Sequence, residues 1–83
     1  MDEELIGTVS DFFAKPVVAG VTLIAPLKVG DKIVIKGHTS NVNTVVTSMQ
    51  IDNVNVTEAN PSDNIGIKVP DRVRKGDEVY KLT

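Results

Sequence analysis

The chain has 83 residues, a net charge of −2 and no cysteine. This length allows one domain with one modest core, and the lack of cysteine excludes a disulfide framework and a thiolate metal site. The slightly acidic balance does not fit a broadly basic nucleic-acid-binding surface, so binding of that kind would depend on a local patch.

The N-terminal part of the chain predicts two strands after a frayed start at residues 1–4. Residues 5–13 form the first, and residues 14–16 end it because proline cannot donate a ladder hydrogen bond. Residues 17–24 are rich in β-branched side chains and predict a central strand. Within it, Gly20 indicates a bulge or a close backbone approach.

A turn followed by a strand comes next and is the clearest local pattern in the sequence. Residues 25–31 predict a loop that ends in Gly30-Asp31, two residue types typical of turns. Residues 32–36 are aliphatic in the middle and charged at both ends, which predicts a partly buried strand. A weaker copy of this unit lies at residues 73–82.

The rest of the chain predicts four more strands, at residues 42–51, 54–56, 65–69 and 79–82. No window shows a sustained helical period with capping signals. Short strands that recur roughly every 8–12 residues favour a barrel or a sandwich, and a closed barrel would leave so short a chain without exposed edges. We therefore predict that residues 1–83 form a single all-β barrel domain.

The order of several short motifs resembles the second domain of elongation factor Tu and of related translational GTPases. They run along nearly the whole chain: Val9-x-Asp11-Phe12-Phe13, Val18-x-Gly20, Leu27-x-Val29-Gly30-Asp31-x-Ile33-x-Ile35, Val45-x-x-Ser48-Met49, Glu58-Ala59-x-Pro61-x-Asp63-Asn64-Ile65-Gly66-Ile67 and Arg74-x-Gly76-Asp77-x-Val79. The resemblance implies a small closed six-stranded Greek-key barrel of the translation-protein type. It also implies that Gln50, Asn53 and Asn64 hold the positions that bind the aminoacylated 3′ end of tRNA, where the family has Glu, Arg and Asn.

A second resemblance is to the C-terminal barrel of the bacterial collagenase-like peptidase family. Residues 26–37, residues 48–52 and the Gly-Asp-Glu-Val-Tyr segment at 76–80 carry it. In that family the barrel is an appendage and not the catalytic part. The resemblance therefore implies an accessory role without catalysis.

One basic cluster is a candidate for contact with RNA phosphates, and it consists of Lys68, Arg72, Arg74 and Lys75. Asp71, Asp77 and Glu78 interrupt the cluster, so an ordinary solvated loop is the alternative interpretation. No lysine or arginine occurs between Gly37 and Ile67, which predicts a neutral to acidic face for that half of the domain.

The sequence predicts no catalysis, no metal and no cofactor. Its single histidine, His38, has no neighbouring metal-ligating residues, and it could act as an acid or base only beside a pocket and a positioned carboxylate. No glycine-rich phosphate loop with lysine is present, so we expect no nucleotide.

The function predicted first is a stand-alone, non-catalytic barrel that binds tRNA, ribosomal RNA, or a translation or RNA-modification protein. The alternative is an accessory protein–protein interaction domain that binds no RNA and works through a sheet edge or an exposed phenylalanine. We expect a cytoplasmic location, because the chain has no cysteine and its acidic N-terminus does not resemble a signal peptide. We expect no membrane contact, because the longest mostly apolar run, residues 16–27, is too short for a membrane helix.

Overall fold

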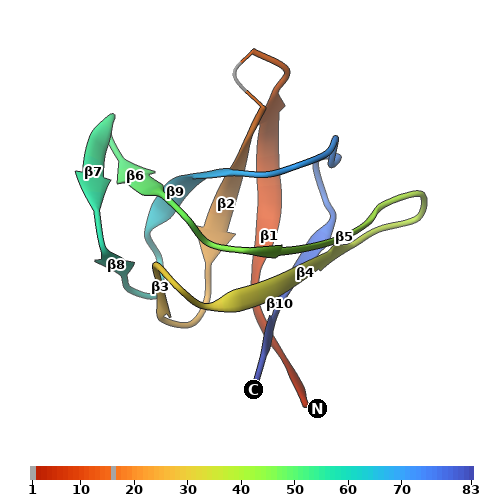
Figure 1. Cartoon of the computed structure of the whole chain (residues 1–83), viewed down its shortest axis with the longest axis horizontal. Coiled ribbons are helices and arrows are strands. Elements are labelled where there is room, and N and C mark those ends of the chain that lie inside the picture. Colours follow the sequence, from red (N-terminus) through yellow and green to blue (C-terminus); the bar gives the residue numbers. More distant parts are fainter. Residues whose placement is uncertain (1, 16) are drawn as a thin grey trace.

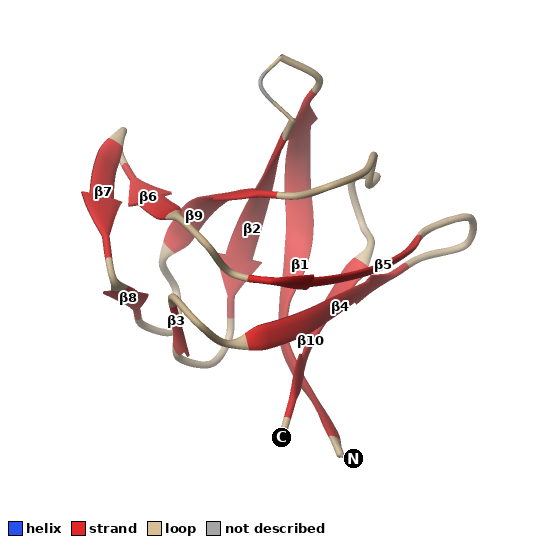
Figure 2. Ribbon diagram, in the orientation of Figure 1, coloured by secondary structure: helices blue, strands red, loops and turns tan. Residues whose placement is uncertain are grey.

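The computed structural model describes residues 2–15 and 17–83. These residues form ten β-strands and no helix (Figures 1 and 2). The strands are β1 (Glu3–Phe13), β2 (Val18–Leu23), β3 (Leu27–Lys28), β4 (Lys32–Lys36), β5 (Asn41–Val45), β6 (Met49–Ile51), β7 (Val54–Val56), β8 (Glu58–Ala59), β9 (Asn64–Lys68) and β10 (Glu78–Leu82). Within the same residues, no helix could span a membrane.

Eight strands form one antiparallel sheet in the order β5-β4-β10-β1-β2-β9-β6-β7, and β3 pairs separately with β8. The sheet curls around the core, as Figure 1 shows, but its ladder ends at β5 and β7, which do not pair with each other. The all-β prediction is confirmed. The closed six-stranded Greek-key barrel is not confirmed, because the ladder stays open and the described residues contain ten strands.

The strand predicted at residues 42–51 is in fact two strands, β5 and β6, which pair with different parts of the sheet. Val46 lies between them and bonds to the turn before β4 instead of to a strand. Its N–H donates to the Asp31 carbonyl at 2.9 Å, and its carbonyl accepts from the Gly30 N–H at 2.8 Å. The chain therefore leaves β4 at this point and turns towards β9.

Three other segments differ from their predictions. β3 lies in residues 25–31, which are predicted as a loop, and β8 lies outside every predicted strand; the two pair only with each other. The start of the chain is not frayed from residue 3 onward, because Glu3 pairs with Leu82 of β10. The predicted break at residues 14–16 includes Pro16, which lies outside the described residues.

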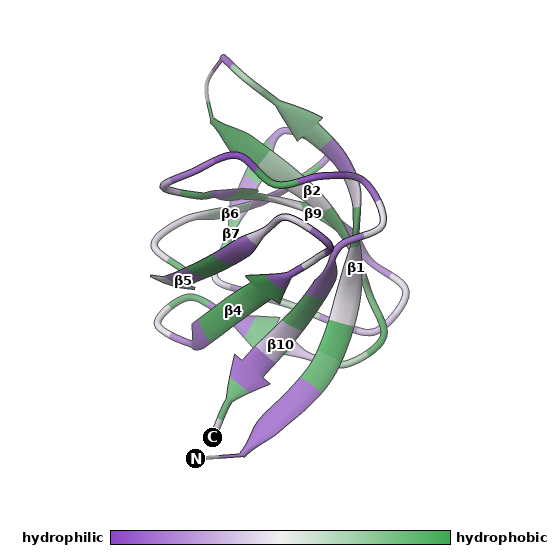
Figure 3. Cartoon of the chain, turned by 90° about the vertical axis from the view of Figure 1, so that its right-hand side faces the viewer, coloured by the Kyte–Doolittle hydropathy of each residue, from purple (hydrophilic) through white to green (hydrophobic). Residues whose placement is uncertain are grey.

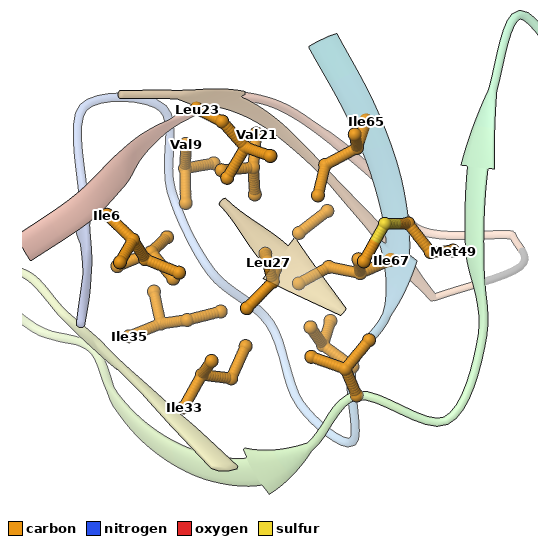
Figure 4. Close-up of a cluster of buried hydrophobic side chains, with 14 of the residues drawn as sticks. Ile6, Val9, Val21, Leu23, Leu27, Ile33, Ile35, Met49, Ile65 and Ile67 are labelled. Carbon is orange, nitrogen blue, oxygen red and sulfur yellow. The ribbon is translucent and has the colours of Figure 1, made fainter. Parts of the chain in front are cut away.

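Aliphatic side chains at alternate strand positions make the core. In β2, Ala19, Val21 and Leu23 are buried, whereas the residues between them face outward. Strand β4 is hydrophobic in the middle and hydrophilic at both ends in Figure 3, as its sequence predicted. In Figure 4, side chains from β1, β2, β4 and β9 point towards one another, with Leu27 of β3 among them.

A four-residue turn with aspartate in its last position occurs three times, at residues 28–31, 60–63 and 74–77. In each, the aspartate carboxylate accepts a hydrogen bond from the first residue's N–H at 2.8–3.0 Å, and the aspartate N–H donates to the first residue's carbonyl at 3.0–3.1 Å. The third residue has positive φ: 100° at Gly30, 78° at Ser62 and 95° at Gly76. We call these the aspartate turns.

Each aspartate turn is fixed to one buried aliphatic residue by two backbone hydrogen bonds. The third residue of the turn donates to the partner's carbonyl at 2.8 Å, and the partner's N–H donates to the aspartate carbonyl at 2.8–3.0 Å. The partners, in chain order of the turns, are Val46, Leu23 and Val9. Because β4, β9 and β10 follow directly, the three turns tie the starts of three strands to the core.

Ser62→Gly is expected to stabilise the domain by about 0.5–1 kcal/mol, because glycine adopts a positive φ without the steric cost that a side chain incurs. The Ser62 N–H keeps its bond to the Leu23 carbonyl. Urea denaturation of the variant and the wild type measures the difference. The control is Ser48→Gly, at a position without positive φ, which is expected to destabilise. A lower midpoint for Ser62→Gly would contradict the prediction.

Candidate functional site

Five outward-facing residues form a row across β1, β2, β9, β6 and β7. Asp11 pairs with Gly20, Gly20 with Gly66, Gly66 with Gln50, and Gln50 with Asn55. The residues that flank the two glycines along β2 and β9 point into the core, so the glycines themselves face outward. The centre of the row therefore has no side chains to cover the backbone.

The two glycines form the floor of a hollow of about 460 Å³ on the outer face of the sheet, which we call the glycine hollow. The backbone does not require glycine here, because neither residue has positive φ. A Cβ added at Gly66 would meet only a Val18 methyl group at 3.4 Å, an ordinary contact. Glycine weakens a strand interior and often marks the close approach of a ligand or another backbone.

A bulge in β1 places an acid and an aromatic ring on the rim of the glycine hollow. The pairing of β1 with β2 shifts register between Val9 and Asp11. A regular strand would point both side chains to one face, but Val9 is buried and Asp11 is exposed. The side chain of Phe13, two residues on, is 52% exposed on the same rim.

Amide side chains line the opposite rim and keep free bonding capacity. Thr22 Oγ1 donates to Asn64 Oδ1 at 2.8 Å, which leaves the Asn64 amide nitrogen available. Gln50 Nε2 donates to Asn55 Oδ1 at 3.1 Å, which leaves the Gln50 carbonyl oxygen available. Asn53 extends this rim from a turn in which it and Asp52 have positive φ.

The structure brings together the three positions that the elongation factor resemblance singled out. Gln50, Asn53 and Asn64 all line the glycine hollow. Sequence reasoning missed Phe13 and Gly66 as members of the same site. The available signal was that Gly20 and Gly66 each interrupt a run of aliphatic strand residues.

The four cations of the predicted RNA-contacting cluster lie in different surroundings. Lys68 is on the outer face of β9 next to Val18, and the Arg72 guanidinium lies over the Phe12 ring at 5.9 Å. Arg74 belongs to the third aspartate turn, whereas Lys75 lines a second hollow beside Tyr80. They do not share one hollow.

The second hollow, which we call the tyrosine hollow, has a volume of about 670 Å³ and also contains His38. Lys36 Nζ lies 2.6 Å from Glu3 Oε1 and 5.3 Å from the centre of the Tyr80 ring. The Tyr80 hydroxyl donates to Glu78 Oε1 at 3.0 Å, and this hydrogen bond raises the pKa of Tyr80 above its ordinary value.

The tyrosine hollow does not assemble the acid–base site that a catalytic His38 would need. Carboxylates are present, but Glu78 is engaged with Tyr80, and Asp77 accepts from the Arg74 N–H at 2.9 Å. Across residues 2–15 and 17–83, no side-chain hydrogen bond involves His38, and no group of His, Asp and Glu residues could hold a metal ion.

Comparison with known proteins finds similarity to parts of peptidase-like proteins. No family model matches the chain. An uncharacterized protease of Methanocaldococcus jannaschii is 44% identical over 78 residues, which make up 93% of this chain and 19% of that protein. The chain thus spans about a fifth of the length of the curated relative that it matches.

Two solved structures have the same fold. One is the C-terminal domain of a Geobacillus thermoleovorans protein assigned to the U32 peptidases, with a TM-score of 0.89, 18% identity, and coverage of 96% of this chain and 93% of that one. The other is its selenomethionine variant, with a TM-score of 0.87, 18% identity and coverage of 92% and 96%. These matches agree with the resemblance to a peptidase appendage, whereas the resemblance to elongation factor Tu stays a prediction.

Proposed function

We propose that this chain is a non-catalytic accessory domain that binds a protein partner and belongs to a peptidase-related system. The observation that carries the proposal is the match, over nearly its whole length, to a domain placed at the C-terminus of a peptidase-like protein. In such a system the chain would supply a binding surface. The glycine hollow is the surface that we assign to binding.

The proposed absence of catalysis rests on how His38 and three of the aspartates are held. Catalytic acids and bases need partners that fix their position and shift their pKa. The aspartates at 31, 63 and 77 instead close the aspartate turns, and His38 has no side-chain hydrogen bond among the described residues. A cytoplasmic location stays part of the proposal.

Binding of tRNA or ribosomal RNA receives less support than binding of protein. Phosphate contacts require cations that converge on the path of the nucleic-acid backbone. Lys68, Arg72 and Lys75 have different neighbours, and no cation lines the glycine hollow. Asp11 and Asp52 on its rim would repel phosphate.

The proposal predicts that the immobilised chain retains protein partners from a nuclease-treated extract, and that Gly66→Thr, which fills the glycine hollow, retains much less. The control is Asn43→Thr on the outer face of β5, away from the hollow. Retained proteins are quantified by mass spectrometry. The purified chain is also expected to release no label from fluorescent casein.

Two results would contradict the proposed function. Hydrolysis of casein by the purified chain would make it an enzyme. Binding of labelled tRNA at micromolar protein and low salt, weakened by Arg74→Ala with Lys75→Ala, would favour the RNA hypothesis, because the loss of phosphate contacts weakens binding of any RNA sequence.

A further inference from the structure

We infer that the glycine hollow binds an arginine side chain carried on an extended segment of a partner protein. The inference rests on the proposed function and names the chemistry of its ligand. It depends on four observations: the charge of the rim, the exposed ring of Phe13, the uncovered backbone of the floor and the free amide groups of the opposite rim.

The charge of the rim favours a cation. Asp11 and Asp52 line the glycine hollow, and no lysine or arginine does. Asp11 Oδ1 accepts the Phe12 N–H at 2.8 Å, which fixes the carboxylate and leaves its second oxygen available. A guanidinium carries five N–H donors in a planar fork, so it can donate to the free Asp11 oxygen and to a neighbouring acceptor at the same time.

The exposed Phe13 ring favours a planar cation. With half of the side chain exposed, its ring provides a face on which a guanidinium can stack. The neighbouring residue already has such a contact within the domain, because the Arg72 guanidinium lies 5.9 Å from the centre of the Phe12 ring. The partner would repeat this contact on the outer face of the sheet.

The floor and the amide rim favour a ligand attached to a peptide backbone. Gly20 and Gly66 place no side chain of their own over the sheet, so a second chain can come close to the backbone there. The nearest side-chain atoms to their Cβ positions belong to Ser10, Asp11 and Val18, at 3.3–3.5 Å. Asn and Gln side chains each carry a donor and an acceptor, as a peptide group does. The free Asn64 nitrogen and Gln50 oxygen can therefore bond to the carbonyl and the N–H of one extended segment.

The test is a titration followed by amide chemical shifts in the nuclear magnetic resonance spectrum. The probe is N-acetyl-arginine-N-methylamide, and its matched control is the citrulline analogue, which has nearly the same shape but no charge. We expect saturable shifts at Gly20, Asn53 and Gly66. The citrulline probe should bind about two- to fivefold more weakly, the effect of one exposed ion pair or cation–π contact.

Variants of the full chain separate the hollow from general effects of charge. Gly66→Thr should abolish the shifts while the fold persists, because the added Cβ meets only an ordinary contact and β-branched residues favour strands. The double variant Asp11→Asn with Asp52→Asn should bind the arginine probe only as weakly as the wild type binds the citrulline probe. Glu4→Gln with Asp71→Asn removes the same charge outside the hollow and should leave the shifts unchanged.

Several outcomes would overturn the inference. These are equal shifts with citrulline, shifts centred on the tyrosine hollow, or shifts that survive Gly66→Thr. Stronger shifts of the hollow with a single-stranded RNA oligonucleotide would identify it as a nucleic-acid site, and shifts that depend on protein concentration alone would identify a second copy as its occupant. Partner retention without an arginine response would reject this inference while the proposed function stands.

Discussion

Replacing Gly37 with alanine is expected to destabilise the domain by about 2–4 kcal/mol. A Cβ at this position would overlap the carboxylate of Asp77, whose side chain is buried at 6% exposure. The carboxylate accepts a hydrogen bond from the Arg74 N–H at 2.9 Å, and it would lose this bond if it moved away from the added Cβ. The third aspartate turn would then lose the hydrogen bond that closes it.

A double-mutant cycle measured by urea denaturation tests this mechanism. Gly37→Ala should cost little in an Asp77→Ala background, because the group with which its Cβ overlaps is gone, so the two effects should be strongly non-additive. Gly66→Ala is the control, since its Cβ meets only a 3.4 Å contact, and it should be neutral or stabilising. Additive effects of Gly37→Ala and Asp77→Ala would show that overlap with the Asp77 carboxylate is not the cause of the loss.

The role of Asp77 shows what the sequence could and could not predict about the fold. The Gly-Asp pairs at 30–31 and 76–77 predicted turns, because glycine supplies positive φ and aspartate bonds to nearby backbone. No local pattern indicates that Asp77 packs against Gly37, which lies in the loop between β4 and β5. The second aspartate turn, at residues 60–63, does not repeat the Gly-Asp pair, because Ser62 holds the position that glycine occupies in the other two.

Long-range backbone bonds explain the main error of the strand prediction. Residues 42–51 have the composition of one long strand, and nothing local interrupts it. The break occurs at Val46 because its N–H and carbonyl bond to residues 31 and 30, which come earlier in the chain. Pairings of that kind are set by the tertiary fold and not by local propensity.

The candidate site was predictable in part. A resemblance of motifs singled out Gln50, Asn53 and Asn64, which the structure places together. The bulge that turns Asp11 outward and the register that sets Gly20 opposite Gly66 depend on pairing between strands. A sequence read alone cannot supply that register, so the floor of the hollow and its aromatic rim became visible only in the fold.

Leu27→Ala is expected to cost about 3–5 kcal/mol, a large part of the roughly 5–10 kcal/mol by which a domain of this size is stable. Leu27 is 1% exposed and lies among the side chains that β1, β2, β4 and β9 direct into the core (Figure 4). Those four strands belong to one hydrogen-bonded sheet that holds their spacing, so we expect little collapse into the cavity left behind.

Val29→Ala provides the matched control, because it removes an aliphatic side chain two residues away that is 38% exposed. It should cost less than about 1 kcal/mol, since little buried area is lost. Urea denaturation gives both values, and an unchanged denaturant slope would show that the difference lies in stability. Equal losses for the two variants would mean that residues 25–31 form the surface loop that their sequence predicts and that β3 adds nothing to the core.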